Sequence, residues 1–209
     1  MKLFLASSNP GKLREYRAMA AGLSLQLDPL PNFDSLPAFE EAAPTFAENA
    51  AGKALHYSRF VAERVIADDS GLVVPALGGA PGPKSARYAG PDAGDVDRVR
   101  KLLKELRRLP AGAGRGEPAR APDERLARFV CVLALAQEGR LIAVFSDCVE
   151  GVLLEEPRGT SGFGYDPIFF YAPLGKTFAE LTPKEKNQHS HRGRAFRKLL
   201  AYLAAGIIE

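Results

Sequence analysis

Short apolar runs alternate with amphipathic segments along most of the chain, and this alternation predicts an α/β protein. Residues 2–6 form a predicted buried strand. Asn9 and Pro10 then suit the N-cap and the first turn of a helix that ends near Gly22. The mixed, proline-rich residues 24–44 are expected to be strand and loop. Apolar residues at helical spacing predict a second helix within 45–64, opened by the capping box of Thr45 and Glu48.

The second half of the chain carries the remaining predicted elements. In "VIADDSGLVV", residues 65–74, a buried strand ends at two aspartates and a glycine. An amphipathic helix over 95–109 precedes a mobile loop at 110–124. Residues 128–154 predict two strands around a turn at 138–139, residues 159–171 a glycine-rich loop entering an aromatic strand, and residues 192–205 the last helix. Residues 1–209 are therefore predicted to form a single α/β domain with an antiparallel element in its second half.

Composition narrows the class of protein. With 46% hydrophobic and 25% charged residues, the 209-residue chain has the profile of a globular protein. A net charge of +3 is too mild to indicate a nucleic-acid binder. We expect a cytoplasmic protein, because no secretory signal or membrane-length apolar run is visible. Cys131 and Cys148 lie in apolar, strand-like stretches, which predicts reduced core thiols rather than a disulfide or a metal pair.

The stretch "SSNPGK", residues 7–12, is a candidate phosphate site. A helix N-terminus offers unpaired N–H groups and a positive dipole end, so anions bind there. Lys12 in the first turn opposes that dipole, a mild conflict that an incoming phosphate would relieve. The stretch is not a Walker A motif, because a single glycine precedes the lysine and Leu13 follows it. On spacing alone, a plain strand-to-helix turn remains the alternative.

The stretch "ADDSG", residues 67–71, is a candidate metal site. Adjacent carboxylates at a strand end repel each other unless a cation is near, and hard oxygen ligands suit Mg²⁺. Glu40 or Glu41 would add a further ligand. The alternative is a solvated acidic loop. Asn49 and Lys53, four residues apart, share one face of the predicted second helix and face either the same anion or water.

Two further stretches suggest a base pocket. In "GFGYDP", Phe163 is placed to stack on a planar base and Asp166 to accept a hydrogen bond from it, or the stretch is an ordinary turn. In "KNQHSHRGR", Lys186, His191 and Arg192 supply donors near a helix start, or form a basic solvated turn. Three histidines are too few for a histidine metal cluster, and no G-x-S-x-G elbow supports a serine hydrolase.

Taken together, these stretches resemble the signature blocks of the inosine triphosphate pyrophosphatase family, in the family's order. The blocks are "SSNPGK", "TFAENAAGKA", "ADDSGLVVPALGGAPGPKSARYAG", "GFGYDPIFF" and "ELTPKEKNQHSHRG", and the resemblance covers about residues 3–203. It implies a mixed α/β sheet with flanking helices, two lobes around a deep central cleft, and a homodimer. It also implies Mg²⁺-dependent hydrolysis of ITP, dITP and XTP to the monophosphate and pyrophosphate.

The resemblance also assigns roles residue by residue. Asp69 would be a metal ligand and the candidate general base, and Glu41, favoured over Glu40, would be the second metal ligand. The residues implied to bind substrate are Ser7, Ser8, Asn9, Pro10, Gly11 and Lys12 with Lys53 at the triphosphate, Ser70, and, around the base, Phe163, Gly164, Tyr165, Asp166, Lys186, His191 and Arg192.

Other functions remain as rivals at this point. A nucleotide-sensing module that binds without turnover would lack the metal carboxylates, which are present. An RNA-binding protein would carry a larger basic excess than +3. Within enzymes, the nearest alternative is a pyrophosphatase acting on modified pyrimidine triphosphates.

Overall fold

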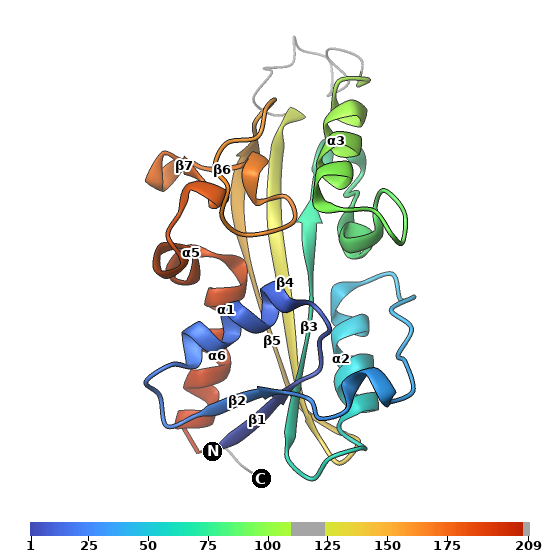
Figure 1. The fold of residues 1–209 in the computed structure, drawn as a ribbon, viewed down its shortest axis with the longest axis vertical. Helices are drawn as coiled ribbons and strands as arrows, with labels where there is room; N and C mark the ends of the chain where they lie inside the picture. Colours follow the sequence, from blue (N-terminus) through green and yellow to red (C-terminus); the bar gives the residue numbers. More distant parts are fainter. Residues whose placement is uncertain (110–123, 207–209) are drawn as a thin grey trace. The chain divides into compact units, whose positions relative to one another are not determined.

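The computed structural model describes residues 1–109 and 124–206, with strands and helices interleaved along the chain (Figure 1). Its strands are β1 (Lys2–Leu5), β2 (Gln26–Pro29), β3 (Arg64–Val73), β4 (Leu126–Gln137), β5 (Arg140–Leu153), β6 (Phe169–Tyr171) and β7 (Lys176–Thr177). Its helices are α1 (Pro10–Ala20), α2 (Phe46–Tyr57), α3 (Asp95–Leu106), α5 (Pro183–His189) and α6 (His191–Ala204), and short 3₁₀ turns connect several elements. Among the described residues, none of these helices is long and apolar enough to cross a membrane.

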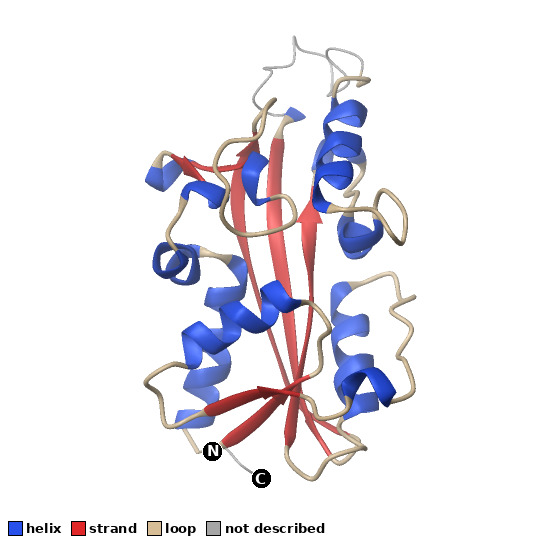
Figure 2. Ribbon diagram, viewed as in Figure 1, coloured by secondary structure: helices blue, strands red, loops and turns tan. Residues whose placement is uncertain are grey.

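The strands form one mixed seven-stranded sheet in the order β2-β1-β3-β4-β5-β6-β7 (Figure 2). β1 pairs in parallel with both β2 and β3, whereas β6 pairs antiparallel with β5 and β7. The predicted mixed sheet with flanking helices is therefore confirmed. The deep central cleft stays a prediction.

The chain divides into two compact units, each assembled from separate stretches of sequence. Unit 1 comprises Met1–Ser70, Cys131–Asp147 and Asn187–Glu209. Its core joins α1 and α6 to the strands: the rings of Tyr16 and Phe196 meet edge to face at 5.2 Å, over Leu5, Ile66 and Leu133. Figure 1 shows α2 on the other side of β3 from α1 and α6.

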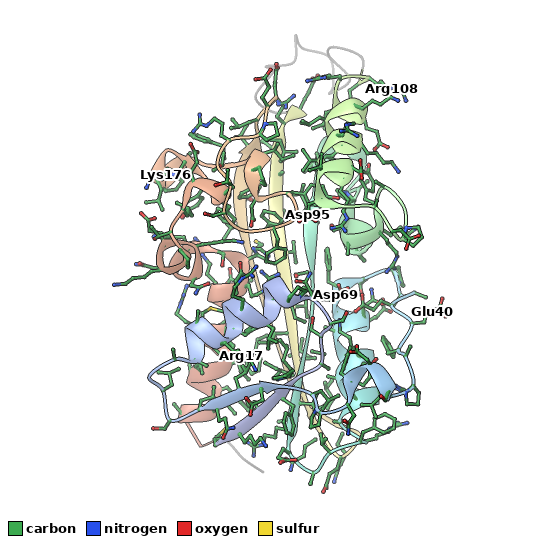
Figure 3. All side chains as sticks on the ribbon, viewed as in Figure 1. Arg17, Glu40, Asp69, Asp95, Arg108 and Lys176 are labelled. Carbon is green, nitrogen blue, oxygen red and sulfur yellow. The ribbon has the colours of Figure 1, made fainter. Side chains whose placement is uncertain are left out.

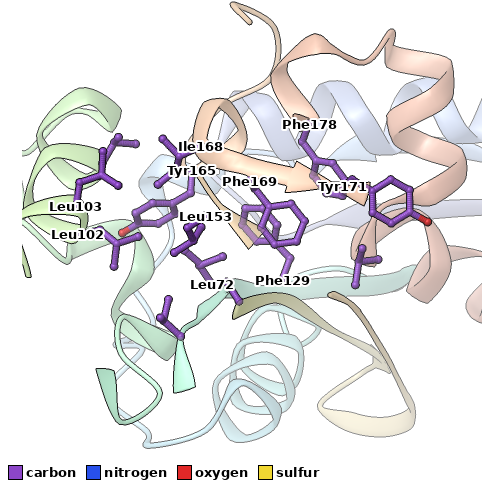
Figure 4. Packing of buried hydrophobic residues seen from close by; sticks show 14 of the residues in the cluster. Leu72, Leu102, Leu103, Phe129, Leu153, Tyr165, Ile168, Phe169, Tyr171 and Phe178 are labelled. Atoms are coloured by element: carbon purple, nitrogen blue, oxygen red, sulfur yellow. The ribbon is translucent and has the colours of Figure 1, made fainter. Parts of the chain in front are cut away.

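Unit 2 comprises Gly71–Val130 and Cys148–Lys186. Its core is aromatic: the rings of Phe129, Phe169 and Phe178 pack together with centroids 4.6–5.8 Å apart (Figure 4). Tyr165 and Leu102 belong to the same cluster, which ties α3 to the strands of this unit.

Several predicted boundaries differ from the structure. The second helix ends at Tyr57, well before residue 64, because the chain turns at 58–63 to enter β3 at Arg64. β3 does not end at the aspartates: it continues through Asp68 and Asp69 to Val73, so the acidic pair lies in mid-strand. The predicted mobile loop at 110–124 falls almost entirely outside the described residues.

The cysteines are only partly as predicted. Both are reduced, but Cys131 is fully buried in β4 whereas Cys148 is exposed on β5. The prediction of a core thiol is therefore confirmed for Cys131 and wrong for Cys148. The apolar run around Cys148 misled because alternate residues of this half of β5 face outward.

Candidate functional site

The turn between β1 and α1 places residues 7–12 beside β3. Because β1 is parallel to β3, with Leu5 opposite Ile66, the turn that follows β1 lies next to the residues that follow Ile66. Asn9 is the N-cap, and its Oδ1 accepts hydrogen bonds from the backbone N–H groups of Gly11 at 2.8 Å and Lys12 at 3.1 Å. The predicted cap is confirmed, and it engages two of the N–H groups expected to serve an anion.

Lys12 reaches from the first turn of α1 to Asp68 on β3. Its Nζ lies 2.8 Å from Asp68 Oδ1 and 3.1 Å from the Asp68 carbonyl oxygen. The Asp68 carboxylate therefore already compensates the charge of Lys12 at the helix start, and whether a phosphate relieves the conflict with the helix dipole further stays a prediction. The lysine is held in place by the protein, with 13% of its side chain exposed.

Asp68 is the residue that joins this part of the site, and its role differs from the metal ligation that the sequence suggested for the adjacent carboxylates. Its carboxylate is fully buried, and its Oδ2 accepts hydrogen bonds from the Tyr16 hydroxyl at 2.8 Å and from Arg192 Nε at 2.9 Å. Burial alone would raise its pKa, but Lys12 and Arg192 hold the pKa of Asp68 well below its usual value. Asp68 is therefore an ionised carboxylate that positions two cations.

Lys53 extends the same arrangement from α2. Its Nζ donates to the Asp68 carbonyl oxygen at 2.8 Å and forms an ion pair with Glu41. Two ammonium groups therefore share one backbone oxygen, because Lys12 donates to it as well. The neighbouring acid Glu40 is exposed and lies on the outside of the loop that precedes α2 (Figure 3). This placement favours Glu41 as the acidic partner in the site.

Asp69 lies on the opposite face of β3 from Asp68, because adjacent strand residues point to opposite faces. Its Oδ2 accepts a hydrogen bond from Asn49 Nδ2 at 3.0 Å, so the two residues that share a face of α2, Asn49 and Lys53, both turn toward β3. The pKa of Asp69 is raised to about 6. Burial is the largest cause; Lys12 acts to lower the pKa, and Glu41 acts to raise it. Glu41, the acidic partner of Lys53, is thus a second negative charge that acts on Asp69.

The donor set fits a magnesium ion. Mg²⁺ is bound by one or two carboxylates and completes its shell with water and substrate phosphates. Glu41 and Asp69 supply two carboxylates, and their mutual repulsion is what a cation would relieve. In the described parts of the chain, no group of three or more acidic, histidine or cysteine side chains gathers as a metal cage.

Arg192 is the second residue of α6, and its side chain contacts residues of unit 1. Its side chain is 4% exposed and uses Nη1 on Glu15 and Nη2 on Ser70, the latter at 2.8 Å, in addition to Nε on Asp68. Ser190 caps this helix by accepting from the backbone N–H of Gly193, and His191 is buried beside it. The expected conflict of the Arg192 charge with the α6 dipole is offset by the carboxylates of Asp68 and Glu15.

The second group of predicted residues lies together in unit 2. Asp166 is buried and accepts at Oδ2 from the Phe163 backbone N–H at 2.8 Å and from Lys186 Nζ at 2.5 Å. Lys186 Nζ also lies 4.7 Å from the centre of the Phe163 ring. The structure thus brings Lys186 into contact with Phe163 and Asp166, although Lys186 lies 20 residues beyond Asp166 in the sequence.

Sequence reasoning missed Tyr16 and Glu15, and it placed Asp68 with Asp69 in a metal site rather than with Lys12 and Arg192. The signal for Glu15 and Tyr16 was present, since they follow Lys12 by three and four residues and so share its face of α1. Asp68 gave no such signal, because its partners lie 56, 52 and 124 residues away along the chain.

Comparisons with known proteins identify the family. The Ham1 family model matches residues 3–202. A dITP/XTP pyrophosphatase of Geobacillus kaustophilus is 47% identical over 95% of this chain and 92% of its own length, and one of Geobacter sulfurreducens is 45% identical over 100% and 99%. The structure of a HAM1 protein from Coxiella burnetii superposes with a TM-score of 0.83 at 39% identity, covering 98% of this chain and 99% of the other.

The fold and the acidic, lysine-rich site are thus those of a nucleotide-pyrophosphatase-like α/β protein. The chain belongs to the Ham1 family. The resemblance inferred from the five sequence blocks is confirmed.

Proposed function

We propose that the protein hydrolyses the non-canonical purine nucleoside triphosphates ITP, dITP and XTP to the monophosphate and pyrophosphate, and so keeps deaminated purines out of the nucleotide pool. The curated relatives that carry the name dITP/XTP pyrophosphatase support the reaction. The observation that carries the proposal is the meeting of Lys12 and Lys53 at one oxygen of β3, one residue from the buried Asp69.

In this proposal the triphosphate binds at unit 1. Lys12 and Lys53 neutralise its charge, and residues 7–11 of the β1–α1 turn approach it with Ser8, which is exposed, and the helix start. Ser70, next to Asp69 on β3, contacts the substrate and shares its hydroxyl with Arg192. The two lysines stay in place because Asp68 and Glu41 hold them.

Glu41 and Asp69 would hold the metal ion, Mg²⁺, which would supply stabilisation of charge on the phosphate oxygens and a lowered pKa for a water. Asp69 orients the attacking water and accepts its proton at a carboxylate oxygen. Its hydrogen bond from Asn49 fixes the carboxylate for this purpose. Attack at the α-phosphorus then releases pyrophosphate.

The base binds at Phe163, Gly164, Tyr165 and Asp166, with Lys186, His191 and Arg192 as the further base-pocket residues. Phe163 stacks on the ring, a contact that any base satisfies. Selectivity therefore rests on hydrogen bonds: hypoxanthine and xanthine carry an acceptor at O6 and a donor at N1, whereas adenine carries the reverse. Donors left unpaired by adenine discriminate by ~10⁴-fold in sites of this kind. The pair of Lys186 with Asp166 supports such a polar pocket.

The proposal also includes a homodimer in the cytoplasm. Light scattering coupled to size exclusion gives the mass in solution, and a monomer at micromolar concentration contradicts the dimer. Fractionation of the source cells tests the location.

Pyrophosphate release across a panel of ITP, dITP, XTP, GTP, ATP and modified pyrimidine triphosphates, with and without Mg²⁺, tests the proposal. We expect release from the inosine and xanthosine nucleotides only, dependent on Mg²⁺. Asp69→Asn is expected to lower kcat by at least ~10²-fold at saturating Mg²⁺. Near wild-type turnover in this variant removes both roles of Asp69, and tight binding without release by the wild type indicates a sensing module instead.

A further inference from the structure

Asp95, the first residue of α3, holds the backbone of the loop that carries Phe163 (Figure 3). Its Oδ2 accepts a hydrogen bond from the backbone N–H of Gly164 at 2.6 Å. Its other oxygen, Oδ1, forms an ion pair with Arg98 one turn further along the helix. The carboxylate is thereby fixed from the helix side and bound to the loop on the other.

The Phe163–Gly164 stretch is bonded through two successive N–H groups, each to a carboxylate. The N–H of Phe163 donates to Asp166, three residues further along the same loop, and the N–H of Gly164 donates to Asp95. The first bond shapes the loop internally, together with Gly162, where a Cβ would lie 2.1 Å from Asp166 Oδ2. Of the two carboxylates, Asp95 is the one outside the loop, so it is the one that places the peptide in unit 2.

A second attachment lies at the next residue but restrains a different part of the loop. The Tyr165 ring packs against Leu102 and Leu103 of α3 in the core of unit 2, and its hydroxyl donates to the carbonyl oxygen of Ser85 at 3.0 Å (Figure 4). This contact fixes the Tyr165 side chain. Gly164 has a φ of +65°, a conformation that glycine adopts without steric penalty. Because sterics do not fix the backbone there, the peptide that joins Phe163 to Gly164 depends on the hydrogen bond to Asp95.

The loop borders open space on its α3 side. A groove of about 680 Å³ runs along this face of α3 and is lined by Asp95, Val96 and Val99, with Gly164 and Pro167 of the loop opposite. Room for displacement is therefore available next to Gly164. Both partners of the hydrogen bond from Gly164 to Asp95 line this groove.

We propose that Asp95 is a positioning residue for base recognition. It fixes the peptide that follows Phe163, so that the Phe163 ring meets the base at a defined angle. The inference rests on the proposed function, because it assigns a consequence to the placement of a base-stacking ring. Asp95 acts through the loop and does not touch the substrate. Since 43% of its side chain is exposed, water competes for the bond, and the effect is moderate.

The chain offers a matched control two residues away. Asp97 lies in the same first turn of α3 and pairs with Arg100 three residues on, as Asp95 pairs with Arg98. Asp95→Ala and Asp97→Ala each remove one negative charge from the helix start and one ion pair. They differ in the bond to Gly164, which Asp97 does not make, and in exposure, because the Asp97–Arg100 pair is more exposed than the Asp95–Arg98 pair.

The kinetic test measures dITP hydrolysis together with competitive inhibition by inorganic tripolyphosphate, a ligand with no base. We expect Asp95→Ala to raise KM for dITP about 10-fold, the scale of one lost hydrogen bond, and to change the inhibition constant of tripolyphosphate by less than about 2-fold. Asp97→Ala should change both by less than about 2-fold. Asp95→Asn, which keeps one acceptor oxygen, should fall between. Equal KM for the two alanine variants, or equal losses for dITP and tripolyphosphate, overturns the proposal.

A spectroscopic test is independent of turnover. The chain contains no tryptophan, so Phe163→Trp supplies a single reporter on the loop. In that background, Asp95→Ala should increase acrylamide quenching relative to Asp97→Ala, while the melting temperatures of the two stay within about 3 °C of each other. Equal quenching contradicts the positioning role even if the enzyme is active. Failure of the wild type to release pyrophosphate from any nucleotide would instead count against the proposed function, and the quenching comparison would still decide the role of Asp95 in the loop.

Discussion

Replacement of Asp68 by asparagine is expected to destabilise the protein strongly without changing the size of the side chain. At neutral pH the wild-type carboxylate is ionised, since Lys12 and Arg192 hold its pKa low despite burial. The amide carries no charge and has only one acceptor oxygen. An NH₂ group at the Oδ1 position would face Lys12 Nζ, and at the Oδ2 position it would face Arg192 Nε. In either orientation, one buried donor meets another donor.

The magnitude follows from the burial of these groups. Asp68 is fully buried and the Arg192 side chain is 4% exposed, so solvent does little to screen the lost attraction. Removing one partner of a buried ion pair costs about 3–5 kcal/mol, because the remaining charge is left without compensation. Glu15 still pairs with Arg192, which favours the lower half of that range. Against a total stability of about 5–15 kcal/mol, this is a large fraction.

Equilibrium unfolding in urea, followed by circular dichroism at pH 7, measures the change. Asp68→Asn should lower the free energy of unfolding by about 3–4 kcal/mol with an unchanged m-value. Asp28→Asn is the matched control: Asp28 is partly exposed, is bonded to the side chain of Gln26, and should cost less than about 0.5 kcal/mol. A loss below about 1 kcal/mol for Asp68→Asn would refute the view that Asp68 compensates the buried Arg192 and the partly buried Lys12.

Two further predictions concern packing and the thiols. Gly71→Ala places a Cβ 2.3 Å from Ser85 Oγ, so the hydrogen bond that this oxygen accepts from the Leu72 N–H must break. We expect the free energy of unfolding to fall by about 2–3 kcal/mol and the melting temperature by roughly 5–10 °C. An unchanged melting temperature would contradict the close approach. A maleimide reagent should modify Cys148 in the native protein and Cys131 only after unfolding. Cys131 is buried, and burial and then the charge of Asp68 raise its pKa. Peptide mass spectrometry that finds Cys131 modified as fast as Cys148 would rule this out.

Local features of the fold could be predicted from the sequence because their determinants are close along the chain. Asn9 was predicted as an N-cap and accepts from two N–H groups of its own helix, and Thr45 accepts from the N–H of Glu48. Both motifs act within three residues. The turn at 138–139 is likewise set by its own residues, with Gly139 at a φ of +76°. The helices and the antiparallel hairpin were predicted from such short-range signals.

The contacts that make the site could not be predicted in this way. Arg192 was interpreted as a donor at a helix start, whereas its guanidinium is held by Asp68 and Glu15, residues 124 and 177 positions away. Nothing in the local pattern distinguishes a cation that faces solvent from one that a distant carboxylate will compensate. The parallel pairing of β1 with β3 brings these residues together, and its register depends on the whole sheet.

The acidic pair on β3 shows how one wrong boundary affected the interpretation of the site. Two adjacent carboxylates in a loop share one environment, and a single cation would serve both. In a continuous strand they point to opposite faces, and here the faces differ: Asp68 meets Lys12 and Arg192 from α1 and α6, whereas Asp69 meets Asn49 from α2. The pKa of Asp68 is accordingly lowered and that of Asp69 raised to about 6. The strand can continue through both charges because α1 and α6 supply the compensating cations, and that same division leaves Asp69 as the carboxylate available for a metal ion and a water.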